Sequence, residues 1–354
     1  MINVLMIPDW RGRNPYQARL AEGIQQAGVH VRFDHPPKGY FKLTRLFMRH
    51  SDVSAIHIHW ITPLVGNVLW TSNKAKVNAK LGLLAADLIL CRVMGRRVVW
   101  TIHNLVSHDS RNPKVEIKTR RLLLRLCHAT ITHSREAKTA VQRALNLDYG
   151  SKIHVIPHGH YIDDYSFDAH SYAELRHRLD IDDGDFVILF FGEIRPYKGV
   201  ENLLEAFLHL DRPDARLVIA GHPWSEDLKR RIEQAAEHDA RISADLFFIA
   251  DRDVASYFHL ADVVLLPFRK TLSSGSTILA MGFGKLLILP DTGRVLGLQP
   301  NKNALFYSTN NHLRTILRDI TKDTTHELGV RNFEMISKNT WTSIGAQTTP
   351  RYIK

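Results

Sequence analysis

Two short loops of this 354-residue chain combine glycine, cations and small polar residues in a pattern that suits phosphate oxygens. The first loop follows the apolar run Phe186–Phe191 and contains Gly192, Arg195, Lys198 and Gly199 before a helical pattern begins. Glycine permits a tight turn, arginine offers a fork of N–H donors, and lysine supplies a point charge. The loop therefore predicts contact with a phosphate group. A capped loop with two solvated cations is the alternative.

The second loop follows the apolar run Val263–Pro267 and contains Ser273, Ser274, Gly275 and Ser276 directly before an apolar helical pattern. A helix N-terminus presents backbone N–H groups, and its dipole favours an anion. An ordinary serine N-cap explains one of these serines but not the whole cluster. Two anion sites in one domain indicate a diphosphate. The chain has neither the Walker spacing nor the dinucleotide fingerprint.

Candidate proton acceptors are found in the first half of the chain. His103 follows the strand-like run Arg97–Ile102, and the end of a parallel strand is where ligand-contacting residues lie. A neutral imidazole can accept a proton near neutral pH. Asp109, in the same loop, and Asp9, after the first strand, are the carboxylate candidates.

The candidate acceptor-binding residues are Asn14, Tyr16, His158 and His160. Asn14 and Tyr16 belong to a loop after the first strand, and the two histidines lie near the predicted crossover between domains. His57 and His59 have a spacing that two metal ligands can have, but a third ligand is missing, so a structural or acceptor-lining role is favoured. Asp251 and Asp253 precede a predicted helix, which favours capping over metal binding. We expect no metal and no cofactor.

Alternating strand-like and helix-like segments predict an α/β protein with parallel sheets covered on both faces. The rhythm is interrupted at 166–184 and then restarts, which predicts two Rossmann-like doubly wound domains, 1–165 and 185–354, with a connecting linker. Such domains hold ligands at the carboxyl ends of their strands, in a cleft. The predicted strands are Ile2–Ile7, Val29–Phe33, Val53–His59, Arg97–Ile102, Ala129–Thr132, Ile153–Ile156, Phe186–Phe191, Arg216–Ala220, Leu246–Ala250, Val263–Pro267 and Lys285–Leu289.

The positive charge is concentrated in the first half. Residues 1–165 contain 24 Lys and Arg against 11 Asp and Glu, whereas the whole chain has a net charge of +11. Such asymmetry indicates an anionic partner, which is a membrane surface or a nucleic acid. The segments 38–50 and 118–125 mix basic and apolar residues, which suits an anionic bilayer interface or an ordinary helix packed on a core.

Two cysteines exclude a disulfide scaffold and fit a reducing compartment. No signal peptide and no membrane span are visible in the sequence. We therefore expect a cytoplasmic protein that associates peripherally with the inner face of the cell membrane.

The chain resembles nucleotide-sugar glycosyltransferases of the GT-B type, and within them the β-mannosyltransferases of xanthan assembly. The resemblance covers nearly the whole chain, and its most specific string is Arg195–Gly199. The matching segments are Asn14–Tyr16, His57–Trp60, Thr101–Leu105 with His108, His158–Tyr161, Gly192–Gly199, Ser274–Gly275 and Trp341 with Ile344 and Tyr352. It implies transfer of mannose from GDP-mannose to a lipid-linked oligosaccharide, with inversion.

The chain departs from the large retaining family of the same fold at the donor site. That family carries two glutamates eight positions apart, where this chain has Thr271 and Leu279, and an arginine where it has Glu193. These differences favour an inverting single displacement, which needs a base and fixed positive groups for the leaving diphosphate. For His103 the resemblance leaves two roles open, the base and a contact to the donor sugar.

Other functions remain as alternatives. A retaining or UDP-sugar-dependent glycosyltransferase of the same fold keeps the donor site. An epimerase or hydrolase on this fold leaves the basic first half unexplained. A nucleic-acid-binding protein would use the basic domain, but the sequence carries no helix-turn-helix, RNP or zinc-finger signature.

Overall fold

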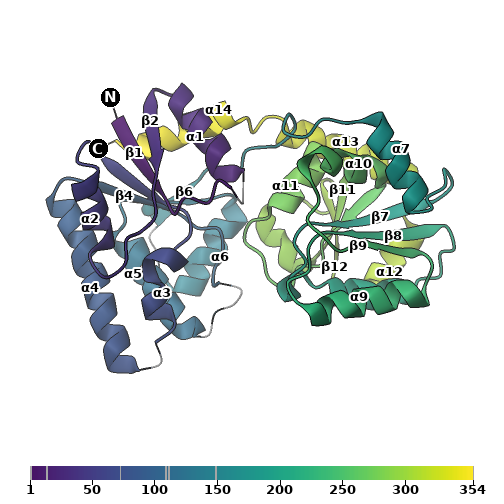
Figure 1. The fold of residues 1–354 in the computed structure, drawn as a ribbon, viewed down its shortest axis with the longest axis horizontal. Helices are drawn as coiled ribbons and strands as arrows, with labels where there is room; N and C mark the ends of the chain where they lie inside the picture. The colour runs from purple at the N-terminus through teal and green to yellow at the C-terminus, as the bar shows by residue number, and fades with distance from the viewer. Residues whose placement is uncertain are drawn as a thin grey trace. The chain divides into compact units, whose positions relative to one another are not determined.

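The computed structural model describes residues 2–12, 15–71, 73–107, 110, 112–147 and 150–353. The chain divides into two compact units. The first unit contains residues 1–159 together with 339–354, and the second contains residues 160–338 (Figure 1). Each unit is an α/β domain with a six-stranded parallel sheet, as the alternating sequence pattern predicts.

The sheet of the first unit has the strand order β2-β1-β3-β4-β5-β6. Chain order reverses between β1 and β3, which are neighbours, with Val4 opposite Ala55. The strands are β1 (Ile2–Ile7), β2 (Val29–Phe33), β3 (Ala55–Ile58), β4 (Arg97–Thr101), β5 (Ala129–Thr132) and β6 (Ile153–Val155).

Polar side chains cap the N-termini of several helices in the first unit. Asn73, Asn112 and Ser134 each accept a backbone N–H of the first turn, which satisfies a donor that the helix itself leaves unpaired. The helices are α1 (Tyr16–Gln26), α2 (Lys42–Arg49), α3 (Thr62–Leu69), α4 (Lys74–Val93), α5 (Pro113–Leu126), α6 (Arg135–Leu145) and α14 (Trp341–Thr348), with 3₁₀ turns at Gly150–Lys152 and Thr349–Arg351.

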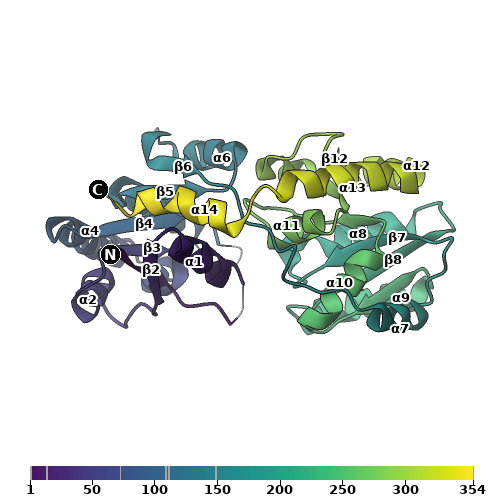
Figure 2. The same cartoon turned by 90° about the horizontal axis from the view of Figure 1, so that it is seen from above.

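The C-terminal helix α14 packs against α1 of the first unit, and both views show the two helices side by side (Figures 1 and 2). Two glycines permit this approach, because a Cβ atom at Gly345 would lie 2.1 Å from the Gly23 carbonyl carbon. Ile344 and Tyr352 join the hydrophobic core around α1 and β1. The prediction that 185–354 forms one domain is therefore wrong for the last residues, since a helix joins whichever core buries its apolar face.

The sheet of the second unit has the strand order β12-β11-β10-β7-β8-β9, with the reversal between β10 and β7. All six residues of β7 are buried, as expected for a parallel strand covered on both faces. The strands are β7 (Phe186–Phe191), β8 (Ala215–Ala220), β9 (Ile242–Asp245), β10 (Val263–Leu265), β11 (Leu286–Pro290) and β12 (Ala304–Tyr307).

Helices α8, α9 and α12 contribute to one hydrophobic core with β7, β8 and β10. Helix α7 packs on α10, so the predicted linker 166–184 is part of the second unit and not a free connection. The helices are α7 (Ala169–Arg178), α8 (Val200–Leu208), α9 (Glu226–His238), α10 (Asp251–Leu260), α11 (Gly275–Gly282), α12 (Asn310–Asp319) and α13 (Lys322–Ile336), with 3₁₀ turns at Pro196–Lys198 and Asp291–Leu296.

One predicted strand is wrong. The apolar run Leu246–Ala250 lies after the strand, which is β9 (Ile242–Asp245). Phe247 and Phe248 are exposed in the structure, so apolar character there does not reflect burial in the sheet. The mixed-polarity run of β9 pairs with β8 because sheet partners, not local hydrophobicity, determine this edge strand.

Candidate functional site

The two predicted phosphate loops follow neighbouring strands of the second unit. β7 and β10 are paired, with Val263 opposite Ile188, and the order of the chain reverses between them. In open α/β sheets, this reversal is where ligands bind at the carboxyl ends of the strands. The structure therefore brings together the two sequence segments that were predicted to hold a diphosphate.

Close backbone contacts join the two loops. The Arg269 N–H donates to the Tyr197 carbonyl at 2.8 Å. A Cβ atom at Gly199 would lie 2.2 Å from the Pro267 carbonyl oxygen, and Gly199 has a φ of +72°. Only glycine fits this position without strain, because the turn is left-handed and the other loop lies against it.

Lys198 extends toward Gly192 at the base of this loop pair. A Cβ atom at Gly192 would lie 3.0 Å from the Lys198 Nζ and 2.9 Å from the Ser276 Oγ, so both polar groups converge beside the Gly192 backbone. Lys198 is 8% exposed, and no hydrogen bond of its ammonium is found within the described ranges of the chain. Burial lowers the pKa of Lys198 to about 8. A bound anion would restore that pKa, since it favours the charged form.

The serine cluster forms the start of α11. The Ser274 Oγ accepts from the Thr277 N–H at 3.2 Å, which makes Ser274 the N-cap. Gly275 and Ser276 occupy the first turn, whose N–H groups and dipole attract an anion. Ser273 precedes the cap, and its carbonyl accepts from the Thr271 hydroxyl at 3.2 Å. The cap thus accounts for one serine, and Ser276 faces Gly192 and Lys198.

Arg195 is held by two neighbours. Its guanidinium lies 4.1 Å from the centre of the Trp224 ring, and its Nη2 donates to Glu193 Oε1 at 3.0 Å. The sequence predicted Arg195 but not Trp224, which comes from the loop after β8 and has no motif around it. Contact with an aromatic face and a bond to a carboxylate restrain the planar guanidinium.

Histidines gather in the first unit at the carboxyl ends of its strands. His59 follows β3, His103 follows β4, His133 follows β5 and His158 follows β6. Tyr16 of α1 lies at their centre, with its ring 4.9–5.8 Å from the centres of these four imidazoles. We call these five residues the histidine cluster. Sequence reasoning found His103, His158 and Tyr16, and considered His59, but missed His133, whose role depends on the sheet order.

The histidine cluster is bordered by two tryptophans. Trp60 stacks on His103 with ring centres 5.0 Å apart, and Trp341 of α14 lies 5.7 Å from His158. The His59 Nδ1 and His103 Nε2 are 3.5 Å apart. The indole rings give apolar contact area beside imidazole nitrogens, which can form hydrogen bonds.

Burial keeps these imidazoles neutral. It lowers the pKa of His133 to about 4 and that of His158 to about 3. The pKa values of His59 and His103 also lie well below 6.5, first because of burial and then because of the neighbouring imidazoles. A neutral imidazole offers one N–H donor and one lone pair, which are the groups needed to bind or deprotonate a hydroxyl.

Comparisons with known proteins place the chain in a family. Residues 171–315 match the family model described as glycosyl transferases group 1. The GDP-mannose:glycolipid 4-beta-D-mannosyltransferase of Xanthomonas campestris pv. campestris is 30% identical over 277 residues, which cover 78% of this chain and 70% of the relative. The chain belongs to the glycosyltransferase group 1 family.

Further similarities agree with this assignment. The alpha-monoglucosyldiacylglycerol synthase of Acholeplasma laidlawii is 23% identical over 194 residues, covering 53% of this chain and 48% of that protein. The crystal structure of Anabaena HepE in complex with UDP and glucose has a TM-score of 0.72 at 17% identity and covers 99% of both chains. Sucrose-phosphate synthase from Thermosynechococcus elongatus has a TM-score of 0.75 at 16% identity, covering 99% and 98%. These structures confirm the predicted GT-B fold of the glycosyltransferase.

The other predicted site residues of the glycosyltransferase have separate outcomes in the structure. Asp9 forms a two-point ion pair with Arg11, at 2.9 Å for both bonds, which lowers the pKa of Asp9. Such a pair weakens a carboxylate as a base. His160 accepts from the Ile162 N–H at 3.3 Å and belongs to the second unit. Asp109 and Asn14 lie outside the described residues.

His57 of the glycosyltransferase has a structural role. Its Nδ1 lies 2.7 Å from the Tyr352 hydroxyl and its Nε2 lies 2.8 Å from the Thr101 Oγ1. The side chain is fully buried. Its two hydrogen bonds join β3 to β4 and to the C-terminal segment. The described part of the chain contains no group of three or more ligating side chains that could hold a metal ion.

A buried ion pair positions the loop that follows His103. The Arg120 Nη2 lies 2.6 Å from the Glu116 Oε1, and both side chains are buried on α5. Arg120 also donates to the Asn104 carbonyl at 2.7 Å, and Glu116 accepts from the Ser107 N–H at 2.7 Å. These bonds attach both ends of the segment 104–107 to α5, which restrains the backbone next to His103.

The first unit of the glycosyltransferase is expected to lose stability between about pH 7 and about pH 5. Its buried imidazoles have pKa values below 6.5, so the unfolded chain binds more protons, and the free energy of unfolding falls as the pH drops below 6.5. Five of the six tryptophans belong to this unit, so tryptophan fluorescence during urea unfolding measures it. An unchanged urea midpoint at the lower pH would contradict the pKa directions.

Proposed function

We propose that this glycosyltransferase transfers mannose from GDP-mannose to a lipid-linked glycan, with inversion at the anomeric carbon. The observation that carries the proposal is the convergence of Lys198, Ser276 and the first turn of α11 beside Gly192. Together they place an ammonium, a hydroxyl and the N-terminal N–H groups of a helix beside the same glycine, and these are groups that bind phosphate oxygens. The choice of mannose, GDP and glycolipid rests on the relative that is 30% identical.

The proposed reaction is one displacement. The acceptor oxygen bonds to the anomeric carbon while the bond from that carbon to the diphosphate oxygen breaks, and the acceptor proton passes to a base. Negative charge develops on the leaving diphosphate, where Lys198, Arg195 and the α11 amides stabilise it. Because these positive groups are fixed in place, we propose that the reaction needs no metal ion and no cofactor.

Two side chains support inversion. Thr271 and Leu279 occupy the places where the retaining relatives resembled by the sequence carry glutamates. In the structure Thr271 bonds to a backbone carbonyl and Leu279 is buried, so neither place offers a carboxylate to the donor. We therefore assign the proton-accepting role to a residue of the first unit.

His103 is the proposed base. It is partly exposed, stacks on Trp60 and is neutral, so it has a lone pair for an acceptor hydroxyl. A hydrogen bond from the neutral imidazole to the donor sugar is the second role that its chemistry permits. We assign His158 and His160 to acceptor binding, and Tyr16 to holding the imidazoles, because its ring is buried and its hydroxyl bonds to Thr101.

The charge of the two units supports a membrane-associated acceptor. The first unit carries 26 Lys and Arg against 9 Asp and Glu, a net charge of +17, and the second carries 21 against 27, a net charge of −6. No helix in the described part of the chain meets the length and hydropathy needed to cross a bilayer. We propose that the first unit rests on the anionic inner leaflet of the cell membrane, where a lipid-linked acceptor is available.

A thermal-shift series with GDP, UDP, ADP and their sugar conjugates tests the donor. A ligand that binds only the folded protein raises the unfolding temperature, so GDP and GDP-mannose are expected to give the largest shifts. Lys198→Ala is the site control and should reduce the shift. A selective UDP response would retain glycosyl transfer and overturn the mannosyl assignment. No response to any nucleotide would overturn the donor site.

A further inference from the structure

The C-terminal segment, residues 341–352, packs on the first unit at both of its ends. Trp341 begins α14, and its ring lies edge-on to Tyr16 with the ring centres 5.6 Å apart. A Cβ atom at Gly159 would lie 2.4 Å from the Trp341 ring, so the indole fits closely against the chain after β6. Tyr352, at the other end, belongs to the hydrophobic core around α1 and β1. The segment therefore contacts the histidine cluster at one end and the core of the first unit at the other.

A row of hydrogen-bonded side chains links Tyr352 to Tyr16. The Tyr352 hydroxyl lies 2.7 Å from the His57 Nδ1, and the His57 Nε2 lies 2.8 Å from the Thr101 Oγ1. The Thr101 hydroxyl is in turn bonded to the hydroxyl of Tyr16. All four side chains are buried, so these bonds form in a place of low dielectric constant where water does not compete for them. We call this row the Tyr352–Tyr16 network.

The available donors and acceptors give the Tyr352–Tyr16 network a direction. Burial lowers the pKa of His57 to about 3, so its imidazole is neutral and has one N–H and one lone pair. Among the described residues, the His57 Nδ1 is the one hydrogen-bond partner of the Tyr352 hydroxyl. The buried O–H of Tyr352 therefore donates to that nitrogen, because it would otherwise lack an acceptor. The His57 Nε2–H then donates to Thr101, and the Thr101 hydroxyl donates to the Tyr16 oxygen.

The network ends on the residue that contacts the proposed base. The Tyr16 ring meets the His103 imidazole edge-on, with the ring centres 5.0 Å apart and the ring planes at 89°. An edge contact of this kind depends on the orientation of the ring, which the bond from Thr101 restrains. Thr101 ends β4, two residues before His103. Because Trp341 contacts the same ring, both ends of the C-terminal segment restrain Tyr16.

His57 also contacts the histidine cluster directly. The centres of the His57 and His59 rings are 4.1 Å apart, and the His59 Nδ1 lies 3.5 Å from the His103 Nε2. A rotation or a change of tautomer at His57 therefore reaches His103 by two routes, through Thr101 and Tyr16 and through His59. A tyrosine hydroxyl that served only to fill the core would have no such connection to the site.

We propose that Tyr352 is a positioning residue for His103. Its hydroxyl selects the Nε2–H tautomer of His57, since the hydrogen bond made by one ring nitrogen determines which nitrogen carries the proton. That tautomer orients Thr101 and Tyr16, and the Tyr16 ring keeps the His103 imidazole in one orientation. The inference rests on the proposed role of His103 and adds to that site a residue from the other end of the sequence. Tyr352 touches no substrate in this assignment.

Kinetics of two hydroxyl-removing variants test this role. Tyr352→Phe keeps the ring and is expected to lower kcat about tenfold, while the KM for GDP-mannose changes less than about twofold. Thr348→Val is the matched control, because the Thr348 Oγ1 is a buried hydroxyl of the same segment that donates to the Ile344 carbonyl at 2.7 Å. It should lower the urea midpoint and keep kcat within about twofold of the unmodified protein, since it breaks only a local bond. Equal falls of kcat in the two folded variants, or an unchanged kcat in Tyr352→Phe, would show that Tyr352 has no positioning role.

A double-mutant cycle tests whether Tyr352 acts through His103. In the His103→Ala protein there is no imidazole to orient, so adding Tyr352→Phe should lower kcat by less than about twofold more. A further loss of about tenfold would mean that the two residues act independently, which rejects the proposal.

NMR of protein labelled with ¹⁵N-histidine tests the network without reference to the reaction. The ring nitrogen shifts distinguish the two tautomers, and the signals of His57 and His103 are identified by their absence from His57→Gln and His103→Ala. His57 is expected to carry its proton on Nε2, and the His103 signals should change in Tyr352→Phe but not in Thr348→Val. A proton on the His57 Nδ1, or unchanged His103 signals in Tyr352→Phe, would contradict the proposal. If the signals behave as expected while His103→Ala retains its kcat, the network is supported and the proposed base is rejected.

Discussion

Replacing Lys198 by alanine is expected to lower kcat/KM about a hundredfold to a thousandfold, as removal of one fixed group facing a developing charge does in other enzymes. Lys198 is buried and converges with Ser276 on Gly192, so its charge acts in a poorly hydrated place. An ammonium there stabilises negative charge more strongly than one in water. Steady-state kinetics with GDP-mannose and a glycolipid acceptor measures the loss.

Two variants make the Lys198 result specific. Lys229→Ala removes an exposed lysine of the same unit, whose nearest carboxylate oxygen in Glu233 is 3.8 Å away, and should change kcat/KM less than about threefold. Lys198→Arg retains the charge and should recover part of the activity, limited by the narrow space beside Gly192. Near-normal kinetics in folded Lys198→Ala would remove Lys198 from the donor site.

Replacing His103 by alanine is expected to have the second large effect, a fall in kcat of about a hundredfold to ten-thousandfold if the imidazole is the base. A base acts in the transition state, so kcat should fall while the KM for GDP-mannose changes little. If His103 instead bonds to the donor sugar, the KM for the donor should rise and kcat should survive. The two roles left open by the sequence are thus separated by one set of kinetic measurements.

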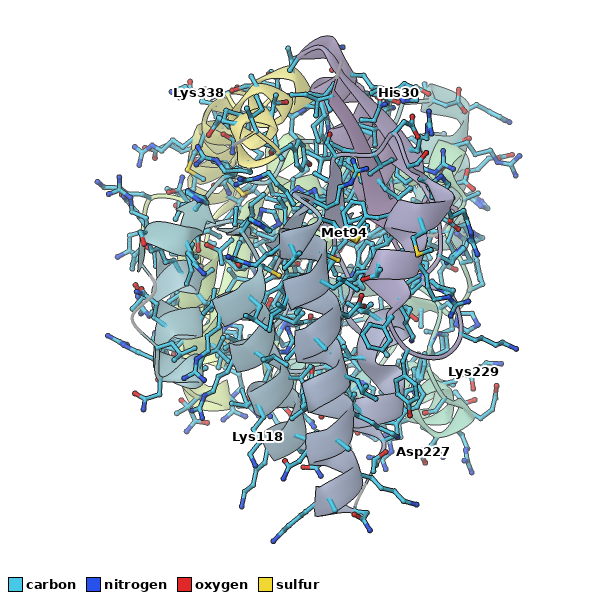
Figure 3. All side chains as sticks on the ribbon, turned by 90° about the vertical axis from the view of Figure 1, so that its left-hand side faces the viewer. His30, Met94, Lys118, Asp227, Lys229 and Lys338 are labelled. Atoms are coloured by element: carbon cyan, nitrogen blue, oxygen red, sulfur yellow. The ribbon has the colours of Figure 1, made fainter. Side chains whose placement is uncertain are left out.

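The pH profile gives an independent check on His103. Its pKa lies well below 6.5, so the proton-accepting form persists as the pH falls, and kcat/KM should decline only on the acidic side of 6.5. His30→Ala is the matched control, because His30 is an exposed histidine of the same unit, on β2 (Figure 3). A profile that falls through pH values above 6.5 would assign that ionisation to another group.

Much of the fold is determined by local sequence. Strands such as Phe186–Phe191 are continuous apolar runs that suit a strand buried on both faces, and their bounds agree with β7. The loop Gly192–Gly199 and the cluster Ser273–Ser276 were predicted as phosphate-binding elements because their residue types carry the chemistry locally. The start of α11 and its Ser274 cap follow from the same local rules.

Only the tertiary structure decided which distant residues meet. His133 carries no local signal, and it joins His103 because β4 and β5 are neighbours in the sheet. Trp224 contacts Arg195 from the loop after β8, and α14 packs on the first unit because Gly23 and Gly345 let two helices touch. The physical reason is the same in each case. Residue type and short spacing determine helices, strands and turns, whereas contacts between elements depend on sheet order and on the packing of complete surfaces, which no short segment contains.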